Sequence, residues 1–124
     1  MKKIEAYIRH EAFEPIRQEL LDVGIPSMSI TDVKGSGRQK GITESYRGSA
    51  MVIHLRPKLK IECVVDDSEA QTVIDTIMKF ARTGEVGDGK IFIYDAVDAI
   101  RIRTGERGAV VLQSHEAEEI PSGV

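Results

Sequence analysis

Hydrophobic and polar side chains alternate along residues 3–8, where Ile4, Ala6 and Ile8 share one face and Glu5 lies on the other. A period of two is typical of a strand with one buried face. Comparable β-rich runs predict further strands. These are expected at residues 28–33, 58–65 and 91–94, with a further short one at 97–102.

Two other segments repeat hydrophobic residues every three or four positions, which predicts amphipathic helices. The first has Pro15 in its first turn and stops at Gly24. Ser68 is expected to open the second helix, with Gln71 placed for a capping box, and Ala81 to close it. The residues predicted to face the core are Phe13, Ile16, Leu20 and Leu21 in the first helix, and Val73, Ile74, Ile77 and Met78 in the second.

The predicted order of elements is β-α-β, a long loop, and β-α-β again. This order is typical of a ferredoxin-like α+β domain, in which two helices cover one face of an antiparallel sheet. Along the predicted strands, the residues of both faces are apolar or of mixed character, as at the neighbouring Cys63 and Val64. We therefore expect the uncovered face of the sheet to pack against other copies of the chain. Residues 109–112 are a candidate edge strand, and the acidic tail beyond them is expected to be solvated.

Composition narrows the class of protein. A chain of 124 residues with 41% hydrophobic residues, 5% aromatics and no Trp predicts one domain with an aliphatic core. The net charge of −3 argues against general nucleic-acid binding. The single cysteine, Cys63, excludes an internal disulfide and fits a reducing compartment. Without an apolar signal-like start or a run of membrane-spanning length, the chain is expected to be cytoplasmic.

The stretch 83–90 is rich in glycine and ends in Lys90. Glycines allow backbone N–H groups to approach phosphate oxygens, and lysine adds a point charge. The stretch satisfies most of the Walker A pattern, but Ile91 stands where that pattern requires Ser or Thr, and a strand follows instead of a helix. A plain helix-to-strand turn is the alternative interpretation. The added charges of Arg101 and Arg103 favour an anion-binding loop of another fold.

Residues 36–57 contain glycines and cations and little hydrophobic pattern. A loop of this length in a compact domain is usually disordered or functional. It is interpreted either as a floppy hairpin or as an arm that a ligand orders and a partner grips.

Several short motifs together resemble one family, the PII nitrogen-regulatory signal proteins. The matching motifs are Met1–Ala6, Thr31–Gly35, Gly37–Gly41, Tyr46–Gly48, Pro57–Glu62, Thr83–Phe92 and Arg101–Gly105. The resemblance implies a homotrimer that binds ATP or ADP in clefts between subunits and reads 2-oxoglutarate through Mg-ATP. It assigns residues 1–108 to the ferredoxin-like domain and 109–124 to a tail. The expected functional loops are 36–57, a phosphate-binding loop at 82–90, and a C-terminal loop at 101–108.

The resemblance also implies site residues. Gly87 to Lys90 would hold the phosphates, Arg101 and Arg103 would reach in from a neighbouring subunit, and Glu62 and Val64 would frame the base. The full nucleotide set is Met28, Ser29, Gly35, Gly37, Arg38, Gln39, Glu62, Val64, Gly87, Asp88, Gly89, Lys90, Arg101 and Arg103. The 2-oxoglutarate set is Gln39, Lys40, Gly41, Lys58 and Gly87, with Gln39 also bridging Mg²⁺. Without the resemblance, Lys58 is interpreted as a solvated lysine at a strand end.

The family's partners include ammonium transporters, regulatory kinases and biosynthetic enzymes. The resemblance implies that Tyr46, Arg47 and Ser49 in the long loop contact such a partner, with no nucleic acid involved and a membrane approached only through a transporter. Many bacterial relatives carry a tyrosine for uridylylation where this chain has Met51, which excludes that modification at this position.

Departures from the family pattern keep other functions open. Ser36 replaces a commonly bulky residue, and Ser27 and Ser29 replace a usual Gly and Thr. The alternative function is therefore a PII-like nucleotide-binding regulator of another pathway, such as carbon or metal transport, that does not sense 2-oxoglutarate. A third possibility, an enzyme, is disfavoured because the sequence shows no catalytic set, so at most slow ATP hydrolysis is expected.

Overall fold

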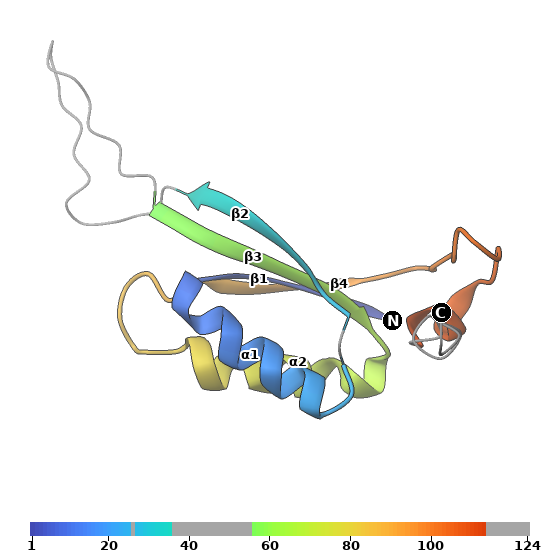
Figure 1. Ribbon diagram of the computed structural model, residues 1–124, viewed down its shortest axis with the longest axis horizontal. Coiled ribbons are helices and arrows are strands. Elements are labelled where there is room, and N and C mark those ends of the chain that lie inside the picture. Colours follow the sequence, from blue (N-terminus) through green and yellow to red (C-terminus); the bar gives the residue numbers. More distant parts are fainter. Residues whose placement is uncertain (26, 36–55, 114–124) are drawn as a thin grey trace, which may run out of the picture.

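The computed structural model describes residues 1–25, 27–35 and 56–113 (Figure 1). In chain order its elements are β1 (Lys2–Ile8), η1 (His10–Ala12, a 3-10 helix), α1 (Phe13–Asp22), β2 (Ser29–Gly35), β3 (Arg56–Val65), α2 (Asp67–Ala81), β4 (Lys90–Asp95) and η2 (Gly108–Leu112, a 3-10 helix). Most of the predicted long loop lies outside the described residues. Its last two residues, Arg56 and Pro57, belong to β3, so that strand begins two residues earlier than predicted.

The four strands form one antiparallel sheet in the order β2-β3-β1-β4. The central strand β1 pairs with β3 on one side, with Ile4 opposite Cys63, and with β4 on the other, with Ile4 opposite Ile93. Both α-helices lie on the same face of this sheet (Figure 1). The arrangement confirms the predicted ferredoxin-like α+β fold.

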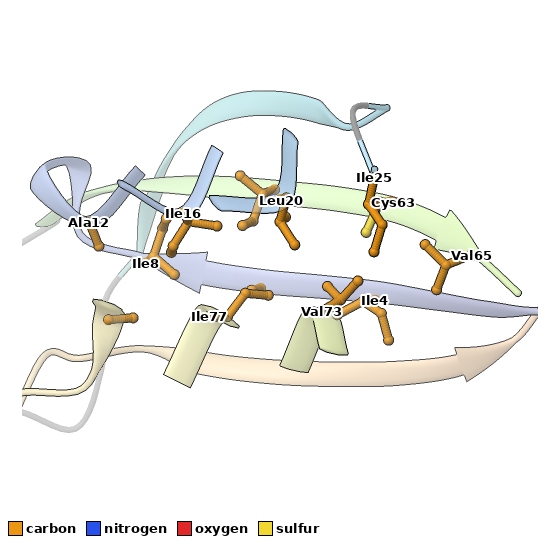
Figure 2. Close-up of a cluster of buried hydrophobic side chains, with 13 residues drawn as sticks. Ile4, Ile8, Ala12, Ile16, Leu20, Ile25, Cys63, Val65, Val73 and Ile77 are labelled. Atoms are coloured by element: carbon orange, nitrogen blue, oxygen red, sulfur yellow. The ribbon is translucent and has the colours of Figure 1, made fainter. Parts of the chain in front are cut away.

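The core lies between the helices and the inner face of the sheet, and its side chains are mainly aliphatic (Figure 2). Ile4 and Ile8 of β1 meet Ile16 of α1 and Ile77 of α2, and each of the four is at most 2% exposed. Complete burial of one such side chain contributes about 1.5–3 kcal/mol to folding. The predicted alternation along β1 and most of the predicted helical stripes therefore account for the core. The prediction was wrong for Leu21 and Met78, which are 45% and 42% exposed, because each follows a buried residue and so is turned away from the core by one helical step.

The start of α2 differs from the prediction. Asp66, not Ser68, is the N-cap residue, and its carboxylate accepts a hydrogen bond of 3.2 Å from the Ser68 backbone N–H. Ser68 also donates its hydroxyl to Asp66, and these bonds lower the pKa of the Asp66 carboxyl. Gln71 makes no capping box, because its amide donates to Asp75 one turn further along. Aspartate and serine are both strong N-cap residues, and the earlier one prevails here.

The segment after β4 was predicted wrongly as a short strand at 97–102. It makes a single isolated bridge, between Ile100 and Arg107, while Val97 and Ile102 are 97% and 98% exposed. The candidate edge strand at 109–112 is also wrong, because these residues form η2. Both segments contain apolar residues, but none of the four described strands pairs with them along their length.

The outer face of the sheet carries a mixture of charged and aromatic residues. Glu5 is only 8% exposed there, and it accepts a hydrogen bond of 2.8 Å from the Tyr7 hydroxyl. Lys3 forms an ion pair of 2.9 Å with Glu62, which lowers the pKa of the Glu62 carboxyl, and Phe92 meets the Tyr7 ring edge-on.

No helix among the described residues is both long enough and apolar enough to span a membrane.

Candidate functional site

The glycine-rich stretch connects the end of α2 to the start of β4, at one end of the sheet (Figure 1). Gly89 has a φ of +106°, and a Cβ placed on it would lie 1.7 Å from the backbone oxygen of Tyr7. Only glycine combines this conformation with so close an approach to β1. Gly84 and Gly87 also have positive φ values, of 91° and 102°. The predicted phosphate-binding loop is therefore an irregular loop packed directly on β1.

Asp88 closes this loop on itself. Its carboxylate accepts hydrogen bonds from the Thr83 hydroxyl at 2.5 Å, from the Thr83 backbone N–H at 2.7 Å and from the Gly84 N–H at 2.8 Å. These bonds, led by the one from the Thr83 hydroxyl, lower the pKa of Asp88 to about 2. An ionised carboxylate repels phosphate, so Asp88 organises the loop and leaves anion contacts to the backbone and to cations.

Two cations hold the loop from outside. Arg9, just after β1, donates to the Val86 backbone oxygen at 2.8 Å and forms an ion pair of 3.2 Å with Asp88. Lys58 of β3 donates to the Gly87 backbone oxygen. Sequence reasoning did not assign Arg9 to the site. Its contacts lie 77 and 79 positions further along the chain, and only its place at the end of β1 could have indicated them.

The same loop leaves backbone donors for an anion. The structure gives the N–H groups of Gly87 and Gly89 no protein acceptor among the described residues. Lys90 follows as the first, exposed residue of β4. Successive N–H groups with a lysine beside them match the chemistry of a bound phosphate.

Gly35, at the end of β2, pairs with Arg56 at the start of β3 and so lies at the same end of the sheet as Lys58. We call this end, with the 82–90 loop, the phosphate end. The predicted site residues that belong to the long loop lie outside the described residues: Gly37, Arg38, Gln39, Lys40, Gly41, Tyr46, Arg47 and Ser49. Within the described ranges, no group of three or more His, Cys, Asp or Glu residues is placed to hold a metal ion.

Glu62 and Val64, which were predicted to frame the base, line one hollow together with Met28 and Ser29 of the predicted nucleotide set. It measures about 680 Å³ and is lined by Lys3, Ser27, Met28, Ser29, Glu62, Cys63, Val64, Val111, Leu112 and Gln113. Ser29 lies opposite Glu62 in the β2–β3 pairing, which explains why two separate motifs converge here. We call this hollow, at the opposite end of the sheet from the phosphate end, the base hollow. Sequence reasoning missed the contribution of residues 111–113, which it placed in a tail.

Arg101 lies beside the base hollow, not beside the phosphate end of its own chain. It is 7% exposed, and its guanidinium bonds to Glu106 at 2.6 Å and to the backbone oxygens of Val110 and Gln113, each at 3.3 Å. Arg103, two residues on, is exposed. One protomer therefore groups the predicted base residues with Arg101, and groups the predicted phosphate loop with Lys58.

Comparison with known proteins identifies the family to which this chain is similar. The family model described as "Nitrogen regulatory protein P-II" matches residues 1–106. "Nitrogen regulatory protein P-II 1" of Escherichia coli (strain K12) is 52% identical over 106 residues, which cover 86% of this chain and 95% of the relative. The "Nitrogen regulatory protein P-II" sequences of Klebsiella oxytoca and Pasteurella multocida (strain Pm70) match with the same identity and coverage.

Proposed function

Because the chain belongs to the nitrogen regulatory P-II family and so has a regulatory role in nitrogen signal transduction, we propose that it works by binding ATP or ADP between the subunits of a homotrimer. The observation that carries the proposal is the phosphate end. There the Gly87 and Gly89 amides have no acceptor among the described residues, Asp88 and Arg9 bond to the loop that carries them, and Lys90 lies beside it. A preorganised set of N–H donors binds an anion without first having to order the loop.

The separation of the base hollow from the phosphate end within one chain supports a nucleotide site between subunits. Ser29 at the base hollow and Gly35 at the phosphate end are six residues apart along β2, roughly 20 Å at the usual rise of a strand. One nucleotide is served by both halves if the phosphate end of one subunit meets the base hollow of the next. The largely exposed side chains of Val97 and Ile102 support an assembly, because their burial against a second copy is favourable.

We further propose that 2-oxoglutarate is sensed beside the nucleotide. Lys58 and Gly87, both expected at that ligand, already touch in the structure, which supports a common pocket. Gln39 would bridge Mg²⁺ and the ligand, with Lys40 and Gly41 alongside. An amide at that position coordinates a metal ion without repelling a dianion.

The output of the sensor would be the long loop at 36–57. In this proposal ATP with 2-oxoglutarate and ADP hold the root of the loop differently, and a partner reads the difference through Tyr46, Arg47 and Ser49. The proposed partner is an ammonium transporter, a kinase or an enzyme of nitrogen metabolism. The chain acts as a regulator, with any ATP hydrolysis slow.

Isothermal titration calorimetry tests the proposal. ATP and ADP would be titrated with and without Mg²⁺ and 2-oxoglutarate, using wild type, Gln39→Ala and the matched surface control Gln18→Ala. We expect nucleotide binding to all three proteins, and 2-oxoglutarate binding only with Mg-ATP and only to wild type and the control. Nucleotide binding without any 2-oxoglutarate response would favour the alternative regulator of another pathway. Absence of nucleotide binding, or a monomeric mass by light scattering, would refute the proposal.

A further inference from the structure

The chain continues past residue 106, where the family match ends, and turns back toward the sheet. Arg107 bridges to Ile100, and the Gly108 N–H donates to the Ala99 oxygen at 3.0 Å. The chain then forms η2, at the end of the sheet where the N-terminus lies (Figure 1). We call residues 108–113 the C-terminal turn.

One buried arginine holds the C-terminal turn at both ends. Arg101 bonds to Glu106 before the turn, and to the backbone oxygens of Val110 and Gln113 within it. The Val110 oxygen also accepts a hydrogen bond of 3.2 Å from the Gln113 backbone N–H, so the guanidinium adds a charged donor to the carbonyls that end the turn. A second pair, Arg107 with Asp98 at 2.9 Å, ties the start of the turn to the preceding loop.

The position of the turn matters because its side chains face a predicted ligand site. Val111, Leu112 and Gln113 line the base hollow opposite Met28 and Val64. Val111 and Leu112 are each only partly buried, so apolar surface remains for a ligand. A purine offers two apolar faces and a polar edge, and small-molecule sites combine apolar walls with a few polar groups in this way.

We propose that the C-terminal turn is a wall of the nucleobase site, that Val111 and Leu112 pack on the base, and that Arg101 is the positioning residue that holds this wall. The inference rests on the proposed nucleotide binding and extends it to residues outside the family match. It assigns Arg101 a role through the wall, in addition to any contact with phosphate.

The two roles of Arg101 make different thermodynamic predictions. Loss of a wall weakens every ligand that carries the base, so adenosine and ATP lose affinity by the same factor. Loss of a phosphate contact weakens ATP and tripolyphosphate but not adenosine, and it also reduces the salt dependence of ATP binding. Inorganic tripolyphosphate, which has no base, should be unaffected by changes to the wall.

The test uses the full-length chain and calorimetric titration of ATP, adenosine and tripolyphosphate. The variants are Leu112→Ala and Arg101→Lys, alone and combined. The matched controls are Leu21→Ala, on the outer side of α1, and Arg17→Lys, in a surface pair with Glu14. Lysine keeps the charge of Arg101 but cannot reach three separated acceptors at once.

Leu112→Ala should weaken ATP and adenosine about tenfold each, the usual effect of removing apolar groups from a pocket. Arg101→Lys should weaken adenosine as well, and the double variant should fall short of the product of the single effects, because both changes damage one wall. Adenosine should slow amide hydrogen exchange at residues 108–113, and tripolyphosphate should not.

Wild-type affinity for adenosine in Leu112→Ala, or an Arg101→Lys effect confined to ATP and tripolyphosphate, would overturn the inference while nucleotide binding itself stands. If wild type binds no nucleotide, the proposed function fails and the inference fails with it. Circular dichroism and mass by light scattering identify any variant that has lost its fold or assembly. If a variant has lost its fold or assembly, the inference is tested on the wild type instead. Adenosine must then slow amide hydrogen exchange at residues 108–113, and the inference fails if it does not.

Discussion

Replacing Gly89 by alanine should damage the chain far more than replacing Gly84, although both glycines lie in the same loop with positive φ. At Gly84 (φ +91°) an added Cβ meets nothing within 4 Å. At Gly89 (φ +106°) it would lie 1.7 Å from the backbone oxygen of Tyr7. The pair therefore separates backbone strain, which both variants carry, from a clash, which only Gly89→Ala carries.

The magnitudes follow from these two terms. Holding a non-glycine residue at such φ values costs about 1–3 kcal/mol. At Gly89 the loop and β1 must also separate by roughly 2 Å before an ordinary contact is restored, because non-bonded heavy atoms prefer to lie about 3.5–4 Å apart. Such overpacking adds about 1–3 kcal/mol. We expect Gly84→Ala to lose about 1–3 kcal/mol of unfolding free energy, and Gly89→Ala to lose about 1–3 kcal/mol more than that.

Urea unfolding followed by far-ultraviolet circular dichroism measures both values, at one fixed protein concentration because assembly contributes to stability. ATP titration of the folded proteins supplies a second readout, since the shifted loop should lose affinity in Gly89→Ala before it does in Gly84→Ala. Equal destabilisation by the two substitutions, within about 1 kcal/mol, would refute the argument that Gly89 is required by its contact with β1.

Three further predictions concern single side chains. Asp88→Asn should destabilise the loop fully above about pH 4 and progressively less as pH falls toward 2, because the pKa of Asp88 is lowered from 3.8 to about 2 in the folded chain. Thermal unfolding from pH 7 to pH 2 checks this, and the two proteins should converge in stability near pH 2. Arg9→Gln should weaken ATP binding measurably while Arg9→Lys weakens it less, because only a cation can pair with Asp88 and bond the Val86 oxygen; unchanged affinity in calorimetry would contradict the role of Arg9. Burial raises the pKa of the Cys63 thiol to about 11, so a disulfide reagent should label it only after unfolding in urea, and rapid labelling of the native protein would show that this thiol is accessible.

The fold could be predicted from the sequence wherever one chain supplies both partners of a contact. The alternation of Ile4, Ala6 and Ile8 is a direct consequence of a sheet that is buried on one side, and each of these residues is at most 1% exposed. The wrong strand at 97–102 shows the limit of this reasoning. Val97 and Ile102 are apolar, but no residue that the structure describes covers them, so their pattern reflects a surface and not a strand.

In the candidate site too, residues with local roles could be predicted from the sequence and residues with long-range contacts could not. Gly89 could be predicted because its chemistry is local: a loop that lies against a neighbouring strand needs glycine. Arg9 could not be predicted from pattern, because one guanidinium joins the end of β1 to a loop far along the chain. A residue whose contacts lie far along the chain can be assigned to a site only once the arrangement of the strands is known.

For Arg101, the charge pattern of the sequence predicted a contact with an anion but gave no indication of its bonds to the C-terminal turn. The cations at 101 and 103 predicted an anion, yet the free chain buries the first guanidinium among Glu106 and two backbone oxygens of the C-terminal turn. Burying a cation is costly unless it is paired and bonded, so this arrangement persists only because the turn supplies acceptors. If the proposed function is correct, a phosphate that bonded to Arg101 would have to compete with these acceptors, and its binding would then be coupled to the shape of the base hollow.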